Sequence, residues 1–243
     1  MILANVRQRL TRDDAQFALR LLARGSTSEF EEAERNLRDR GIDALLDDPR
    51  LLRALLDSPQ AAYASFPLFA YVVVRNALRD VRETDRGIAD YVASIVIHYG
   101  MRERAQRVSE TDDEVYDTLS SLLGDVDRGD PARTFLVRAH LGNYALWLSG
   151  LYPDFIEYRR WRRGGPDLDY FDELGRRGYE LAAQHRLAAQ YGLEDLYAAA
   201  AERFPKLRLA LNRVSDSLFF PARHSPERLM RQVRDESRWM PNC

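Results

Sequence analysis

The stretch ARTFLVRAHLGNYALWLSG, residues 132–150, decides the fold of this chain. Its length and spacing predict a helix that is apolar almost all round and is therefore buried. At about 100° per residue, one face carries Leu136, His140, Asn143, Tyr144, Trp147 and Leu151. The opposite face carries Arg138, Gly142, Ala145 and Ser149. These small residues predict the close approach of a second helix, and Arg138 then needs a carboxylate or carbonyl partner.

The rest of the chain also predicts helices, because apolar residues recur at spacings of three and four while strand-like alternation is scarce. We expect them near residues 11–24, 28–40, 42–47, 49–57, 66–82, 85–100, 112–124, 154–163, 168–190, 193–203, 205–219 and 225–236. Ser28 and Glu31 have the spacing of a capping box. The predicted fold is an all-α bundle of about nine to eleven helices around the buried central helix, 132–150.

Two features of the sequence bear on domain organisation. GDVDRGDP, residues 124–131, is the strongest loop pattern and could separate two subdomains within a single helical domain, 1–221. A polar C-terminal arm, 222–243, follows with one short helix. Its apolar residues form a narrow stripe that includes Leu229, Met230 and Val233. This stripe either docks in a groove on a partner or packs on the chain's own bundle.

Composition limits the functional classes. The 243 residues include 36 basic and 38 acidic ones, so the whole chain lacks the positive field of a general nucleic-acid binder. Lys206 is the only lysine, a bias that we attribute to a GC-rich genome. The single cysteine, Cys243, excludes an intrachain disulfide and a cysteine metal cluster. The N-terminus has no signal-peptide core, and the most apolar stretch, 135–152, is too short and polar to cross a membrane. We therefore expect a soluble cytoplasmic protein.

The segments LGNYALWLSGLYP and YFDELGRRGYELA resemble segments of uncharacterised helical proteins of bacteria. This resemblance covers about 40 residues of the chain. It implies a helical fold and no particular activity.

One candidate ligand site lies within the predicted bundle. His140, Asn143, Tyr144 and Trp147 share a helix face that could line a small-molecule pocket, with Arg138 and His98 as further polar candidates. The alternative is a core histidine that is hydrogen-bonded to its neighbours.

A second candidate is the basic cluster in EYRRWRRGGPDLDYFDEL, residues 157–174, which comprises Arg159, Arg160, Trp161, Arg162 and Arg163. Cations are favoured in the last turn of a helix, Gly164 and Gly165 supply its end, and Asp167 can cap the next helix. We therefore interpret the cluster mainly as the basic end of one helix, next to the start of another. The alternative is an interaction patch formed by the arginines and Trp161. Arg75, Arg79, Arg82 and Arg86 form another basic face, which we interpret as solvated.

No catalytic motif is present. The sequence has no Glu-x-x-His, no zinc-like histidine spacing, no phosphate-binding glycine loop and no Gly-x-Ser-x-Gly. We thus expect no cofactor and no metal, and a non-enzymatic adaptor or regulator that binds a protein partner or a second copy of itself. A small-molecule binder or enzyme with its pocket near His98 and His140 is the first alternative. A nucleic-acid binder that uses residues 159–163 is the second.

Overall fold

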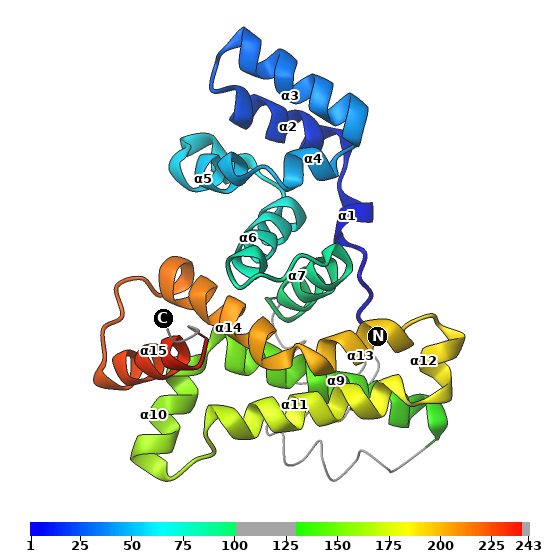
Figure 1. The fold of residues 1–243 in the computed structure, drawn as a ribbon, viewed down its shortest axis with the longest axis vertical. Helices are drawn as coiled ribbons and strands as arrows, with labels where there is room; N and C mark the ends of the chain where they lie inside the picture. Colours follow the sequence, from blue (N-terminus) through cyan, green and yellow to red (C-terminus); the bar gives the residue numbers. More distant parts are fainter. Residues whose placement is uncertain (101–129, 240–243) are drawn as a thin grey trace. The chain divides into compact units, whose positions relative to one another are not determined.

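The computed structural model describes residues 1–100 and 130–239. Of these residues, 81% lie in helices and none in a strand, which confirms the predicted all-α class. They form 14 α-helices, 11 of which have seven or more residues, together with one 3₁₀ helix and one π-helix (Figure 1). The predicted helix at 112–124 and most of the predicted loop at 124–131 lie outside the described residues.

The chain divides into two compact units. The N-terminal unit comprises Ile2–Ile97, and the C-terminal unit comprises His98–Cys243 together with Met1. The boundary between them falls inside helix α7 (Arg86–Gly100). Within α7 every residue from 88 to 97 is buried.

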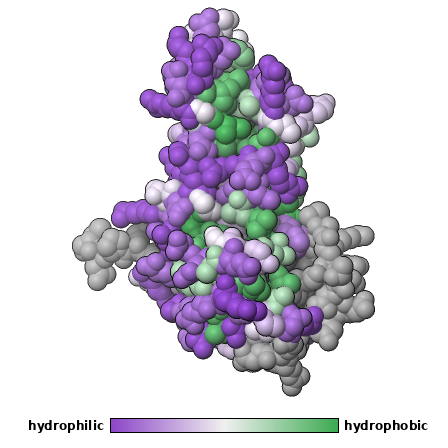
Figure 2. Space-filling model, turned by 90° about the vertical axis from the view of Figure 1, so that its right-hand side faces the viewer, coloured by the Kyte–Doolittle hydropathy of each residue, from purple (hydrophilic) through white to green (hydrophobic). Residues whose placement is uncertain are grey.

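The N-terminal unit contains short and medium helices before α7. They are α1 (Val6–Arg9), α2 (Arg12–Ala23), α3 (Thr27–Arg40), α4 (Asp43–Leu46), α5 (Pro49–Asp57), the 3₁₀ helix η1 (Pro59–Tyr63) and α6 (Phe66–Asp80). On the side shown in Figure 2, hydrophilic residues cover much of the outside of this unit, with some apolar residues visible among them.

Capping side chains fix where these helices begin. Thr11 and Asp14 form a capping box at the start of α2, and the Ser26 hydroxyl accepts the Glu29 backbone N–H at the start of α3. The predicted capping box at Ser28 is wrong, because α3 begins at Thr27 and Ser28 already lies within its first turn. Asp85 accepts the N–H groups of Gly87 and Ile88 at the start of α7, close to the predicted beginning of this helix.

The interpretation of the basic face at 75–86 as solvated is wrong for Arg75. Its side chain is buried and donates from Nε to Asp47 at 2.7 Å and from Nη1 to the Thr84 carbonyl at 2.8 Å. Arg86 pairs with the same carboxylate, and Arg79 donates to the Asp47 carbonyl. Asp47 is thus the shared counter-charge that ties α6 and α7 to the end of α4.

The C-terminal unit contains longer helices. They are α9 (Pro131–Leu151), α10 (Pro153–Arg163), α11 (Leu168–Ala183), α12 (Arg186–Gln190), α13 (Glu194–Glu202), α14 (Phe204–Val214), the π-helix η3 (Ser215–Phe219) and α15 (Pro226–Trp239). The predicted continuous helix at 168–190 is wrong. His185 adopts an extended backbone and its Nδ1 accepts the Leu187 N–H, while its ring stacks on Phe135 with centroids 5.4 Å apart. The predicted helix at 205–219 likewise changes to π geometry after Val214.

Helix α9 crosses α11 at close range, and the two lie side by side in Figure 1. A Cβ atom on Gly142 would lie 2.5 Å from the Tyr179 ring, and one on Gly178 would lie 2.7 Å from the Gly142 backbone nitrogen. Glycine is therefore required on both helices for this approach. Arg138, on the same face of α9, donates from Nη1 to the Leu181 carbonyl at 3.5 Å. The predicted close crossing at Gly142 and the predicted carbonyl partner of Arg138 are both confirmed.

Candidate interaction surface

Helix α10 carries an exposed row of aromatic side chains. In YPDFIEYRRW every third residue is aromatic, and the four rings are 38% (Tyr152), 46% (Phe155), 47% (Tyr158) and 58% (Trp161) exposed. Each step of three residues turns about 60° back around a helix, so these side chains sweep about half of its circumference. Tyr152 contacts the Trp147 and Phe220 rings. Among the described residues, no other aromatic ring contacts the remaining three side chains.

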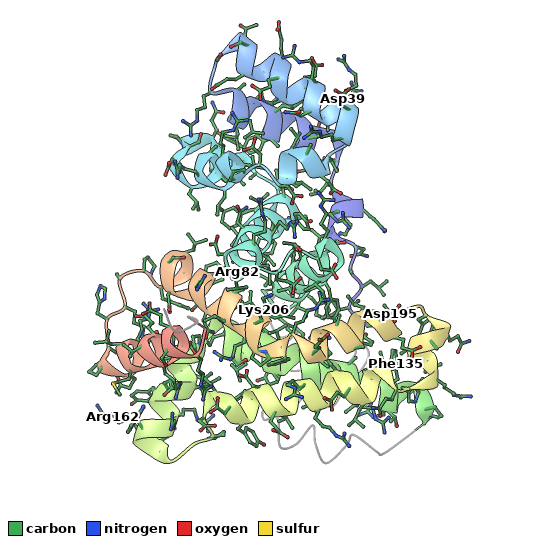
Figure 3. All side chains as sticks on the ribbon, viewed as in Figure 1. Asp39, Arg82, Phe135, Arg162, Asp195 and Lys206 are labelled. Atoms are coloured by element: carbon green, nitrogen blue, oxygen red, sulfur yellow. The ribbon has the colours of Figure 1, made fainter. Side chains whose placement is uncertain are left out.

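The arginines of the 159–163 cluster surround these rings. The Arg159 guanidinium lies 5.6 Å from the centroid of the Phe155 ring, and that of Arg160 lies 5.5 Å from the Trp161 ring. Arg160 also pairs with Glu157 at 3.6 Å. Within the described residues, no ion pair joins Arg159, Arg162 or Arg163 to an acid. The side chain of Arg162, labelled in Figure 3, points outward from the end of α10.

We call this surface the α10 ridge and define it by its exposed aromatic and basic side chains. They are Phe155, Tyr158, Trp161, Arg159, Arg162 and Arg163. The charge pattern of the sequence points to Trp161 and the arginines but not to Phe155 and Tyr158. The three-residue aromatic spacing could have pointed to them, although the same spacing also occurs on buried helix faces.

The structure confirms the predicted end of α10 and the predicted start of α11 on either side of Gly164. Gly164 ends α10 in the left-handed conformation, with φ of 64°, and its N–H donates to the Arg160 carbonyl. Asp167 accepts the Tyr170 N–H at 3.0 Å and begins α11. The inner face of α10 is buried through Asp154, Ile156 and Glu157. The helix is thus anchored on one side, and the ridge occupies the other.

The predicted ligand residues of α9 lie in a buried polar cluster. His140, Asn143 and Tyr144 are all buried. The Tyr99 hydroxyl and His140 Nδ1 are hydrogen-bonded at 2.9 Å, and the Tyr179 hydroxyl donates to Asn143 Oδ1 at 2.9 Å. Burial raises the pKa of Tyr99 well above its ordinary value, and the neighbouring tyrosines add to this effect. Tyr99 therefore stays protonated at neutral pH.

Aromatic contacts join these side chains to one another. His140 stacks on Tyr144, Tyr144 stacks on Trp147, and the ring centroids in both pairs are about 6 Å apart. The Tyr99 ring packs edge-on against both His140 and Trp147. His98, which is half-buried, contacts the Tyr99 ring. The predicted residues of this site therefore lie around Tyr99, which the sequence did not point to. Arg138 is the exception, because its side chain faces α11.

Several further findings concern the described residues. They contain no group of three or more His, Cys, Asp or Glu side chains arranged to hold a metal ion. Within the same ranges, no helix has both the length and the apolar character that crossing a membrane requires. Comparison with protein-family models, curated protein sequences and solved structures finds no match for this chain.

Proposed function

We propose that this protein is an interaction module, an adaptor or regulator that binds a protein partner through the α10 ridge. The observation that carries the proposal is the exposure of Phe155, Tyr158 and Trp161 next to three arginines. Tyrosine, tryptophan and arginine are the residues that most often dominate binding energy at protein interfaces. A group of exposed large apolar side chains rimmed by polar residues typically marks an interaction site.

The charge of the ridge indicates the chemistry of the partner. Arg159, Arg162 and Arg163 have no acidic partner within the described residues, so their guanidinium groups are available to carboxylates. A partner that brings Asp or Glu to these positions, and apolar side chains to the rings between them, would match both features. We therefore propose an acidic segment of a partner protein as the ligand of the ridge.

The alternative of a small-molecule site near His98 and His140 has less support. The rings of His140, Tyr144, Trp147 and Tyr99 pack on one another, and hydrogen bonds join His140 to Tyr99 and Asn143 to Tyr179. Such a cluster serves equally well as a polar part of the core. Nucleic acid is the other alternative ligand, because bases can stack on Trp161 between arginines.

Site-specific photo-crosslinking in cells tests the proposal. A photoreactive phenylalanine analogue at position 158 should give one dominant protein adduct, whereas the same analogue at Tyr191, which is 56% exposed in the same unit, should not. The double substitution Arg159→Glu and Arg162→Glu should abolish that adduct. Equal amounts of adduct at positions 158 and 191 would rule out specific binding of a partner at the α10 ridge. An adduct at position 158 that nuclease removes would favour the nucleic-acid alternative.

A further inference from the structure

Helix α15 docks on the C-terminal unit with its charged face inward. Leu229, Met230 and Val233, the predicted apolar stripe, are 62%, 63% and 57% exposed. Arg228 and Arg231 are only 5% and 2% exposed. The alternative in which the stripe packs on the chain's own bundle is therefore wrong. An amphipathic helix normally buries its apolar face, and α15 does the opposite.

Acidic side chains from three neighbouring elements receive the α15 arginines. Asp154 of α10 accepts Arg228 Nε at 3.0 Å and Arg231 Nη2 at 3.3 Å. Asp216 of η3 accepts Arg231 Nη2 at 2.6 Å and lies 3.1 Å from Arg228 Nη2. Glu157, itself buried, accepts Arg234. At the far end, Asp169 of α11 accepts two hydrogen bonds from Arg238, at 2.7 and 3.0 Å.

These contacts define a site for a helix with arginines at successive turns. We call it the acidic site; its members are Asp154, Glu157, Asp169, Asp172 and Asp216. Asp172 is held by Arg208 of α14 at 2.7 Å. The residues 221–224 that lead into α15 are exposed, so a short surface connection joins the helix to the unit.

Helix α15 is an imperfect occupant of this site, because it brings its own acid, Asp235, into it. The Asp235 carboxylate is buried, and neither oxygen has a hydrogen-bond donor among the described residues. Its nearest cations are Arg208 at 3.6 Å and Arg231 at 3.8 Å. The pKa of Asp172 is raised by burial, and the nearby charges of Asp169 and Asp235 add to this effect. Asp235 therefore adds a second acid close to Asp172, and the two ion pairs that offset this charge are longer than the shortest ion pair of each other acid in the site.

We propose that the acidic site is a receptor for an arginine-bearing helix of a partner protein. In this proposal α15 occupies the site until the partner helix displaces it. Arginine–carboxylate pairs with fixed geometry select a ligand by register, whereas buried ion pairs add little net stability. The docking of α15 is thus suited to exchange with a better-matched helix. This inference goes beyond the α10 ridge and does not depend on it.

The test uses the full chain and a fluorescein-labelled peptide of residues 224–239 as the probe. In the wild-type chain the peptide competes with tethered α15, whose effective concentration through a short linker is on the order of millimolar. Arg231→Gln in the chain weakens the tethered helix. We expect this change to lower the peptide's Kd, measured by fluorescence anisotropy, at least about tenfold. Binding should weaken as salt is added.

Two matched control peptides separate the arginine face from the apolar face, each with three substitutions. The peptide with glutamine at positions 228, 231 and 234 keeps the apolar stripe and should lose binding. The peptide with serine at positions 229, 230 and 233 keeps the arginines and should bind within about threefold of the parent. The peptide with Asp235→Asn should bind more tightly than the parent. The opposite order of the first two peptides would overturn the proposal.

A second measurement covers the case in which the Arg231→Gln chain fails to fold. In the wild-type chain, excess Asp235→Asn peptide should speed hydrogen exchange in α15 but not in α13, because the displaced helix loses its protection. Unchanged exchange in α15 at several times the effective concentration of the tether, about 10 mM, would overturn the proposal. The ridge substitution Tyr158→Ala should leave peptide binding unchanged, so failure of the acidic site and failure of the α10 ridge give different results.

Discussion

Replacement of Gly142 by alanine tests the close crossing of α9 and α11 with the smallest possible change. The new Cβ would lie 2.5, 2.6 and 2.7 Å from three atoms of the Tyr179 ring. That ring is fully buried and its hydroxyl donates to Asn143, so it cannot swing into solvent. Alanine gains about 1 kcal/mol over glycine in helix propensity. Overpacking costs about 1–3 kcal/mol, and a broken buried hydrogen bond costs about 1–3 kcal/mol more. We expect a net loss of about 1–5 kcal/mol.

Urea unfolding followed by tryptophan fluorescence measures this loss in the relevant unit, because all three tryptophans lie in the C-terminal unit. Gly142→Leu should destabilise further, since its side chain is larger. The control is Gly165→Ala, whose Cβ would meet no atom closer than 3.4 Å. It should change stability by less than about 0.5 kcal/mol. If Gly142→Ala unfolds at the same urea concentration as the parent, the close crossing is wrong.

Three further predictions concern charged residues. Glutamine at all four arginines of 159–163 should lower the free energy of unfolding only modestly, by about 0.3–1 kcal/mol for each helix-end charge; a chain that is unfolded at ordinary temperature would contradict this. Arg75→Gln should destabilise the N-terminal unit by about 3 kcal/mol in a thermal melt, because it removes the buried one of the two arginines that pair with the partly buried Asp47 carboxylate. Burial opposes ionisation of Asp47, but hydrogen bonds from Arg75 and Arg86 outweigh it and lower its pKa from 3.8. The stability that Asp47 contributes is therefore present above pH 3.8 and lost as pH falls through the lowered pKa, and Asp47→Asn should reduce this acid sensitivity.

Local rules predicted most helix boundaries, because they depend on residues close in sequence. Proline lies at the first position of α5 and α10 and at the second position of α6, and all three helices begin within a residue of the expected places; Gly164 ends α10 as predicted. The break at residue 185 was missed, because histidine is not a usual helix cap and the His185 ring packs against Phe135, 50 positions away. A pattern of helical residues cannot reveal a contact of that kind.

The candidate sites were predictable in composition but not in arrangement. Helical periodicity placed His140, Asn143 and Tyr144 on one face, yet their partners Tyr99 and Tyr179 come from other helices. Arg75 illustrates the same limit, because its spacing is typical of a solvated face and only the fold brings Asp47 to it. For charged residues the sequence gives the charge, and the tertiary structure decides whether that charge is buried.

Helix α15 shows why an amphipathic pattern alone does not tell which face of a helix is buried. The pattern rule assumes that the receiving surface is apolar. Here α10, α11 and η3 present Asp154, Asp169 and Asp216, so desolvating the apolar stripe against them would leave these carboxylates without cations. Turning the arginines inward satisfies the carboxylates and leaves the stripe in water. The orientation of α15 is therefore set by the acids of its receptor, and a chain in which Asp154 and Asp216 were replaced by leucine should favour the opposite face. Hydrogen exchange and cysteine labelling at positions 230 and 231 would distinguish the two orientations, with Met230→Cys protected in the substituted chain and accessible in the parent.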